Sequence, residues 1–352
     1  MTGPRIGVVG AGVIGMRHIA VLASDPRAFT LVAVADPAPA AEAVARSHGV
    51  PWFADYRQML DACRLDGVVI ASPNKLHTST ALTCLDRKVA VLIEKPIADT
   101  LEEALRVADA SRKSGVPVSV GHHRRHNPLM TRAREFIDAG ELGRMVAVVA
   151  FSLRRKNDGY FDMPWRREKG GGPLLINGIH EIDNLRMLCG EIDSVQTITS
   201  NATRGLAVED TFAATLKFRN GALGTLTLSD AVQAPWDWNH TSGEEPEFAW
   251  EDQNSCMVCG TEASLAIPSL EHWRNENGGG RGDPCVRGRL YHVPADPVQR
   301  ELLQFMRVIR GEEPPLMSAE EAGRTLACVL AMGQSAATGQ WVNVDELYAC
   351  VA

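Results

Sequence analysis

A histidine lies on an apolar, helix-like segment that follows three glycines. The stretch GGGPLLINGIHEIDNLRML (residues 170–188) places Asn177 three residues before His180 and Asp183 three residues after it. Residues three apart share roughly one face of a helix, so an amide, an imidazole and a carboxylate would lie in a row. Two interpretations are open: a core histidine with hydrogen-bond partners, or a general base whose tautomer Asp183 holds.

A second group of residues has the spacing of a dinucleotide site. Gly10, Gly12 and Gly15 follow an apolar β run as G-x-G-x-x-G, and Asp36 ends the next β run, 21 residues after Gly15. In this pattern the first glycine permits a tight turn, the second lets the backbone approach a pyrophosphate, and the third lets helix and strand pack closely. The helix start supplies N–H groups and the positive end of a dipole. The residues expected to contact the cofactor here are Gly10, Gly12, Val13, Ile14, Gly15 and Asp36.

Asp36 indicates which dinucleotide is bound. Its carboxylate can accept hydrogen bonds from both ribose hydroxyls and would repel a 2′-phosphate. No arginine occurs in the stretch DPAPAAE, which begins at Asp36. The sequence therefore favours NAD over NADP.

Further polar residues follow two later β runs, at 66–72 and 89–94. Ligands lie at the carboxyl edge of a parallel sheet, and a lysine there can be desolvated, which lowers its pKa, or can hold a substrate oxygen. The simpler alternatives are a helix cap for Asn74, a surface position for His77, and a surface ion pair between Glu94 and Lys95. The residues expected at this edge are Ser72, Pro73, Asn74, His77, Glu94 and Lys95.

Strands alternate with helices in the first third of the chain, which indicates a doubly wound parallel sheet buried on both faces. After a helix near 127–139, a helix at 173–188 and successive long β segments predict an α+β domain with a large, mostly antiparallel open sheet. Residues 232–254 are expected to form a long loop, and helices are expected at 297–310 and 318–338. The predicted class is thus α/β, with a dinucleotide-binding domain at 1–122 and a substrate-binding and oligomerisation domain at 123–352.

Charge and composition exclude several functions. The chain has 352 residues and a net charge of −7, and its basic runs, such as Arg154-Arg155-Lys156, are short. Such runs are typical of a solvated face or a local anion contact, so neither nucleic acid nor a membrane surface is expected as a partner. No apolar run is long enough to span a bilayer. Eight scattered cysteines indicate reduced thiols in the cytoplasm. The lone pair Cys256 and Cys259 would point to opposite faces of a strand, so no metal site is expected.

Taken together, these motifs resemble the glucose-fructose oxidoreductase / inositol dehydrogenase (Gfo/Idh/MocA) family. The resemblance covers nearly the whole chain and implies an N-terminal Rossmann domain and a C-terminal domain whose open sheet often packs against a sister subunit, as in a homodimer or homotetramer. The matching stretches are GAGVIG at 10–15, Asp36-Pro37, SPN..H at 72–77, EKP at 94–96, RRHNP at 124–128, WR at 165–166 and GGG…H..D at 170–183.

The resemblance implies an NAD-dependent oxidoreductase that reversibly oxidises a secondary alcohol of a sugar, inositol or related cyclic polyol by hydride transfer. Lys95 and His180 would flank the nicotinamide, one as the base and the other as the group that holds the developing oxyanion. The family usually has an aspartate four residues before the histidine, whereas this chain has Ile176. Asn177 can bind a substrate hydroxyl in its place but cannot act as a base, and Asp183 either orients the imidazole or has a structural role.

Trp165 and Arg166 are expected to line the substrate pocket, with a merely buried aromatic as the alternative for Trp165. Two other functions stay open. The changed pair Ile176 and Asn177 and the Trp-rich stretch 236–250 are compatible with a non-sugar ring such as an aromatic-acid cis-dihydrodiol. A non-catalytic dinucleotide-binding regulator is the third interpretation, although the chain keeps both the lysine and the histidine.

Overall fold

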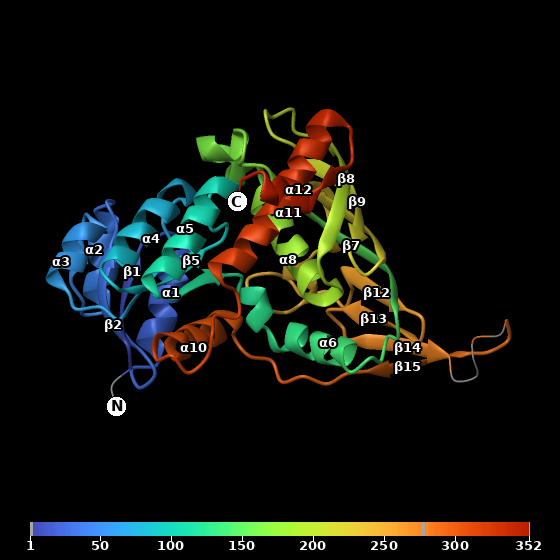
Figure 1. Cartoon of the computed structure of the whole chain (residues 1–352), viewed down its shortest axis with the longest axis horizontal. Coiled ribbons are helices and arrows are strands. Elements are labelled where there is room, and N and C mark those ends of the chain that lie inside the picture. The colour runs from blue at the N-terminus through green and yellow to red at the C-terminus, as the bar shows by residue number, and fades with distance from the viewer. Residues whose placement is uncertain (1–2, 276–278, 280, 352) are drawn as a thin grey trace. The chain divides into compact units, whose positions relative to one another are not determined.

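The computed structural model describes residues 3–275, 279 and 281–351 and divides into two compact units. Unit 1 comprises the chain up to His126, together with Asp296–Leu326 and Val351. Unit 2 comprises Asn127–Ala295 and Ala327–Cys350. Each unit has its own sheet, and the two are described in turn (Figure 1).

Unit 1 is built on a parallel sheet in the strand order β3-β2-β1-β4-β5-β6. Its central strands are short runs of Val, Ile, Leu and Ala that are buried throughout, as expected for a sheet covered on both faces. The order reverses beside β1, which is the switch point where ligands bind in doubly wound sheets. The predicted sheet is confirmed. The strands are β1 (Arg5–Val9), β2 (Thr30–Ala35), β3 (Trp52–Phe53), β4 (Gly67–Ile70), β5 (Ala90–Glu94) and β6 (Val118–Gly121).

The crossover helices of unit 1 begin and end at recognisable signals. The Thr100 side chain caps α5, whose first turn carries two glutamates and whose last turn carries Arg112 and Lys113 before Gly115. Asp55 caps α3 in the same way. Neither α3 nor the two-residue strand β3 was expected, because both are too short to show a period. The helices are α1 (Val13–Ser24), α2 (Ala40–Ser47), α3 (Tyr56–Ala62), α4 (His77–Asp86) and α5 (Leu101–Ser114).

Residues 296–326 return to unit 1, so the expected continuous domain 123–352 is interrupted. In α10 (Pro297–Ile309), Phe305 and Ile309 pack so closely on β4 that a Cβ added at Gly67 would lie 2.8 Å from Ile309. The Val120 N–H of β6 then donates to the carbonyl oxygen of Met317 at 2.9 Å. An amphipathic period predicts this helix but cannot say which core its apolar face joins.

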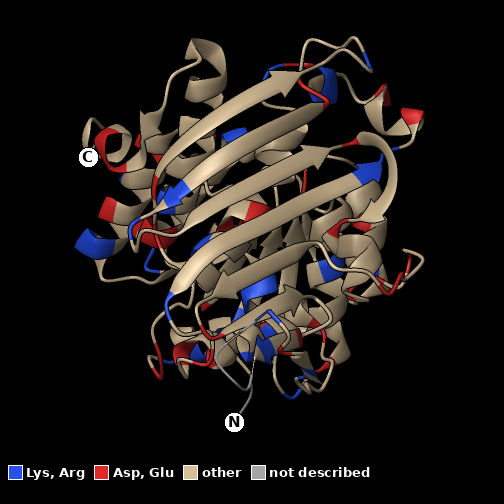
Figure 2. Ribbon diagram, turned by 90° about the vertical axis from the view of Figure 1, so that its right-hand side faces the viewer, with Lys and Arg blue, Asp and Glu red and all other residues tan. Residues whose placement is uncertain are grey.

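Unit 2 contains the larger sheet, in the order β15-β14-β13-β12-β7-β10-β9-β8-β16, with β11 paired to β7. Its pairs are antiparallel except β7 with β10, which is parallel. Strands β9 and β10 alternate buried and exposed residues, so one face is covered and the other is open. Figure 2 shows these long strands side by side. The predicted mostly antiparallel open sheet is confirmed.

The strands of unit 2 are β7 (Met145–Arg155), β8 (Ile192–Ser200), β9 (Thr211–Phe218), β10 (Leu223–Ser229), β11 (Ala231–Trp236), β12 (Cys256–Gly260), β13 (Ala263–Ile267), β14 (Glu271–Asn275), β15 (Cys285–Arg289) and β16 (Val342–Asn343). Strand β11 and the short helix α9 (Trp238–Thr241) occupy part of the stretch 232–254 that was expected to be a loop. The eight cysteines are all free thiols.

Helix α8 (Gly178–Cys189) is almost wholly buried and packs on β7 and α6 (Pro128–Asp138). The helix expected at 173–188 is in fact two helices, α7 (Pro173–Ile176) and α8, which meet at Asn177. Two 3-10 turns precede them, η3 (Asp158–Asp162) and η4 (Pro164–Arg167). Helix α11 (Ala319–Thr338) contains the boundary at Leu326, and α12 (Val344–Ala349) follows β16. Within the described ranges, no helix is both long enough and apolar enough to cross a bilayer.

Candidate functional site

The packing of the chain requires glycine at two positions of the turn after β1 but not at a third. Gly10 has φ +97°, and a Cβ on Gly15 would lie 2.1 Å from the Gly10 carbonyl oxygen. Any side chain is therefore excluded at both positions. A Cβ on Gly12, by contrast, would meet nothing within 4 Å. The open space at Gly12 is what the approach of a pyrophosphate to the backbone would need.

The start of α1 and the carboxylate of Asp36 complete this turn. No side chain caps α1 and its first turn contains no acidic residue, so its N–H groups and positive dipole end are available to an anion. The Asp36 carboxylate accepts the Ala11 N–H at 2.7 Å through Oδ2 and the Ala38 N–H at 2.7 Å through Oδ1. These residues of unit 1 fit a dinucleotide, with phosphate at the helix start and ribose near Asp36.

His77 is a buried bridge between two loops. Its Nε2 lies 2.8 Å from the Ser72 carbonyl oxygen and its Nδ1 lies 2.9 Å from the Pro96 carbonyl oxygen. Burial lowers the pKa of His77, although both carbonyls act in the opposite direction. The alternative of a surface histidine is wrong, and so is the capping interpretation of Asn74, whose side chain caps neither η1 (Asn74–Leu76) nor α4.

Glu94 holds the backbone of Lys95 rather than forming a surface ion pair with it. The Glu94 side chain is buried, with Oε1 2.7 Å from His18 Nε2, and Oε2 accepts the Lys95 N–H at 3.1 Å. Burial by itself would raise the pKa of Glu94. The hydrogen bond and charge of His18, with the charges of Lys95 and His123, outweigh it and lower this pKa to about 2. The surface ion-pair interpretation is therefore wrong.

His18 and Glu94 form a buried cluster with Glu301 of α10, in which one ligand-type atom from each residue lies within 4.8 Å of the others. The 2.7 Å contact between His18 and Glu94 has the length of a charge-assisted hydrogen bond. The cluster thus ties α1, β5 and α10 together. The peptide between Lys95 and Pro96 is cis.

In unit 2, close packing requires glycine at two positions of the turn before α7. A Cβ on Gly171 would lie 2.1 Å from the Trp165 carbonyl oxygen, and one on Gly172 would lie 2.2 Å from Glu209 Oε1. Glu209 also accepts the Leu174 N–H at 2.9 Å, and burial raises the pKa of its carboxyl. The glycine turn therefore presses η4 against the start of α7, which brings Trp165 and Arg166 into the same region as Asn177.

His180 and Asp183 both lie in the buried part of α8, with 8% and 1% of their surfaces exposed. The His180 N–H donates to the Asn177 carbonyl oxygen at 3.1 Å, at the point where α7 gives way to α8. The roles of His180 as a base and of Asp183 as its orienting group stay predictions.

Asn177 has a partner that sequence reasoning missed. Lys156 Nζ donates to Asn177 Oδ1 at 2.7 Å, lies 4.3 Å from the centroid of the Tyr160 ring, and is 3.8 Å from Asp230 Oδ2. Arg204 Nε lies 2.9 Å from the other oxygen of Asp230. Lys156 is buried, so the interpretation of its basic run as a solvated face is wrong for this residue. The alternation of buried residues along β7 predicts that Lys156 faces inward. Val148, Ala150 and Ser152 are buried, and Lys156 follows at the same two-residue period.

Arg166 and Trp165 lie at an exposed edge of this group. The Arg166 guanidinium carbon is 3.9 Å from the Tyr160 ring centroid and 5.3 Å from that of Trp165, and its Nη1 donates to the Tyr160 carbonyl oxygen at 2.8 Å. Trp165 is 46% exposed, so the interpretation of a buried aromatic is wrong. An exposed indole beside an arginine suits the wall of a ligand site.

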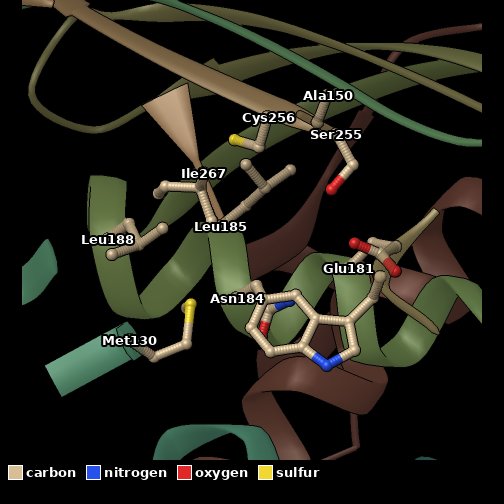
Figure 3. Close-up of a pocket in the computed structure, with 10 residues that line it drawn as sticks. Met130, Ala150, Glu181, Asn184, Leu185, Leu188, Ser255, Cys256 and Ile267 are labelled. Atoms are coloured by element: carbon tan, nitrogen blue, oxygen red, sulfur yellow. The ribbon is translucent and has the colours of Figure 1, made fainter. Parts of the chain in front are cut away.

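A small cavity lies under α8, on the side of Glu181 and Asn184 (Figure 3). Its volume of about 10 Å³ is near the lower limit for one water molecule. Neither Asn177 nor His180 lines it, so it is distinct from the predicted substrate residues. The cavity is lined by Met130, Ala150, Glu181, Asn184, Leu185, Leu188, Trp238, Ser255, Cys256 and Ile267.

A doubly wound parallel sheet with an open glycine turn and a carboxylate at the end of the second strand defines a dinucleotide-binding protein. Residues 4–122 match the model of an oxidoreductase family with an NAD-binding Rossmann fold, and residues 130–266 match the GFO/IDH/MocA C-terminal domain. The chain belongs to the Gfo/Idh/MocA family of oxidoreductases.

Individual relatives act on cyclic polyols and sugars. The chain is 32% identical over 260 residues to the rhizopine catabolism protein MocA of Rhizobium meliloti, covering 71% of this chain and 80% of that protein. It is 26% identical over 349 residues to the NAD⁺-dependent scyllo-inositol 2-dehydrogenase of Bacillus subtilis, covering 97% and 96%. A structure of levoglucosan dehydrogenase with NADH and levoglucosan superposes with a TM-score of 0.80 at 22% identity, covering 97% and 99%. These findings support a nicotinamide-dependent dehydrogenase of sugars or polyols.

Proposed function

We propose that this protein is an NAD-dependent dehydrogenase that oxidises a secondary alcohol on a cyclic polyol. The observation that carries the proposal is the glycine turn of unit 1. Gly10 and Gly15 are closed against the chain, while Gly12 faces open space at an uncapped helix start. The Asp36 carboxylate beside that turn, with no basic residue in the stretch that follows it, supports NAD rather than NADP.

In this proposal Lys95 and His180 handle the proton of the reacting hydroxyl. A bound nicotinamide would supply the acceptor for the hydride of the carbinol carbon. One of the two side chains takes the hydroxyl proton, and the other donates a hydrogen bond to the oxygen as its charge develops, which contributes roughly 10²–10⁴-fold to the rate. Glu94 and His18 position Lys95 through its backbone N–H. The remaining cofactor contacts are assigned to Ser72, Pro73 and Asn74 at the end of β4.

The test follows NADH formation with inositols, sugars and an aromatic-acid cis-dihydrodiol, for the wild type and the variants Lys95→Ala and His180→Ala. We expect oxidation of at least one cyclic polyol with NAD, and a loss of 10²-fold or more in kcat in each variant. Arg155→Ala serves as the control, because this exposed side chain has one distant ion pair, 3.9 Å from Asp158. Full activity in both site variants would refute the assignment. NADH binding without turnover of any substrate would favour a regulator.

Two wider expectations belong to the same proposal. The open face of the unit 2 sheet is the candidate surface for a homodimer or homotetramer, to be checked by light scattering at several protein concentrations. A cytoplasmic location is supported by eight free thiols distributed over both units, as is typical of a reducing compartment.

A further inference from the structure

Unit 2 contains a cluster of cationic and amide side chains around Tyr160. We call it the donor patch and define it as Lys156, Tyr160, Arg166 and Asn177. Lys156 Nζ and the Arg166 guanidinium carbon lie 4.3 Å and 3.9 Å from the Tyr160 centroid, and Asn177 joins the group by accepting a hydrogen bond from Lys156. The patch adjoins the start of α8, which carries His180.

Lys156 determines which end of the Asn177 amide is presented. An ammonium group can only donate, so its 2.7 Å contact fixes Oδ1 toward Lys156 and turns the NH₂ group away from it. Among the described residues, Nδ2 of Asn177 has no hydrogen-bond partner. Asn177 therefore offers a donor, whereas the aspartate that the family usually has at the position of Ile176 would offer an acceptor.

Arg166 carries a positive charge that no carboxylate balances. Within the described ranges, no acidic oxygen lies within 4.0 Å of its guanidinium, whereas Arg167 is 3.7 Å from Asp162 and Arg204 is 2.9 Å from Asp230. Its Nε is buried and without a hydrogen-bond partner. A half-buried guanidinium held on an aromatic ring is prepared to bind an anion, because it is less screened than a surface charge and has little rotamer freedom to lose.

A buried acidic residue beside the patch already has cationic partners. Asp230 is buried between Lys156 and Arg204, and Arg204 Nη1 also lies 3.6 Å from Asp158, so these two cations face two carboxylates. Tyr160 adds a further donor, since its hydroxyl has no hydrogen-bond partner among the described residues. Burial raises the pKa of Tyr160, which keeps this hydroxyl protonated. A ligand at the patch thus meets the unbalanced positive charge of Arg166 and hydrogen-bond donors from Arg166, Asn177 and Tyr160.

We propose that the donor patch binds a carboxylate, so that the substrate is a cyclic polyol acid such as a hexuronate or its glycoside. One unbalanced cation matches one singly charged group, and guanidinium and amide N–H groups suit carboxylate oxygens. Arg166 would bind the carboxylate, and Asn177 Nδ2 would donate to an oxygen of the same ligand. This inference rests on the proposed function, because it names the substrate class of the same reaction.

The test compares matched substrates with the wild type and three variants. Methyl β-D-glucuronide, methyl β-D-glucoside and glucose 6-phosphate present a carboxylate, a neutral hydroxymethyl group and a phosphate on similar rings. We expect kcat/KM for the glucuronide to exceed that for the glucoside by 10- to 100-fold, mainly through KM. Arg166→Gln should remove most of this preference. Arg167→Gln, which removes a neighbouring ion-paired arginine, should leave it in place.

Asn177→Asp is the third variant, because it keeps the size of the side chain and places an acceptor where the donor was. It should lower kcat/KM for the glucuronide at least 10-fold more than for the glucoside, since a second carboxylate repels the substrate. A glucoside preference in the wild type, a higher rate with the phosphate, or equal losses on both methyl glycosides in Arg166→Gln would overturn the carboxylate assignment, while the dehydrogenase proposal would stand.

A binding measurement separates this inference from the proposed function. Methyl β-D-glucuronide and methyl β-D-glucoside are titrated into the NADH-loaded protein by calorimetry. Tighter binding of the acid that Arg166→Gln weakens at least 10-fold supports the donor patch even if none of the substrates is oxidised. Equal binding of the two glycosides, or equal binding of the acid by wild type and Arg166→Gln, overturns it.

Discussion

Two alanine substitutions in the glycine turn should have opposite effects on folding and on cofactor binding. At Gly15 an added Cβ would lie 2.1 Å from the Gly10 carbonyl oxygen and 2.9 Å from its carbon. Both atoms belong to the backbone of a tight turn, which cannot move without disturbing the end of β1. At Gly12 an added Cβ meets no atom within 4 Å. The two substitutions thus add the same methyl group, once against backbone atoms and once in open space.

The expected magnitudes follow from these contacts. An overlap of more than 1 Å with backbone forces a shift that costs about 3 kcal/mol in the free energy of unfolding, so Gly15→Ala should be strongly destabilised. Gly12→Ala should change the free energy of unfolding by less than about 0.5 kcal/mol, because its φ of −70° suits alanine and nothing is displaced. The same methyl group would occupy the space assigned to the pyrophosphate, so Gly12→Ala should raise the Kd for NADH about tenfold or more, which corresponds to at least about 1.4 kcal/mol.

Urea unfolding followed by circular dichroism measures the first quantity, and fluorescence titration with NADH measures the second. Wild-type affinity in Gly12→Ala would refute the placement of the dinucleotide at this turn. A loss of stability in Gly12→Ala as large as that in Gly15→Ala would show that the open space at Gly12 does not exist in solution.

The remaining predictions concern pH and a buried cation. Burial, followed by the charges of neighbouring histidine and arginine side chains, lowers the pKa of His126 from 6.5 to about 3. The unfolded chain binds a proton at this imidazole near pH 6.5, whereas the folded chain does not. The low pKa therefore adds up to about 5 kcal/mol to the free energy of unfolding above pH 6.5, and this contribution is lost as the pH falls toward 3. Urea unfolding between pH 7 and 4 should show this slope, and His126→Asn should flatten it; an unchanged slope contradicts the assignment. Lys156→Met should lower the free energy of unfolding by about 2–4 kcal/mol, because it removes one of the two cations that face the buried Asp230. Arg155→Met should change it by less than about 0.5 kcal/mol. Equal values for the two variants in urea unfolding would disprove the difference.

Short-range patterns were sufficient to predict the parallel sheet, the glycine turn and Asp36. Each depends on a strand, a turn and a helix start that are neighbours in the sequence, so local chemistry determines the geometry. The antiparallel sheet followed for the same reason, from alternation along β9 and β10. The break at Asn177 was not predictable, because apolar residues continue on both sides of it and their period does not show where one helix ends.

Long-range contacts account for most of what the sequence did not reveal. Alternation along β7 indicates that Lys156 faces inward, but its contacts with Asn177 and Asp230 join residues 21 and 74 positions away. Glu94 is similar, since nothing near it in the sequence indicates that His18 is its partner. The return of α10 to unit 1 also depends on which core is available to its apolar face. Side chains of this kind are identified only when the fold brings distant segments together.

The hydrogen bond from the Ala11 N–H to Asp36 means that the glycine turn is already ordered before any ligand arrives. A loop that must be organised during association loses conformational freedom at that moment, and the loss subtracts from affinity. Here the carboxylate has fixed the turn in advance. Capture of the dinucleotide should therefore be fast and close to a rigid docking event, with a small entropic penalty for the protein.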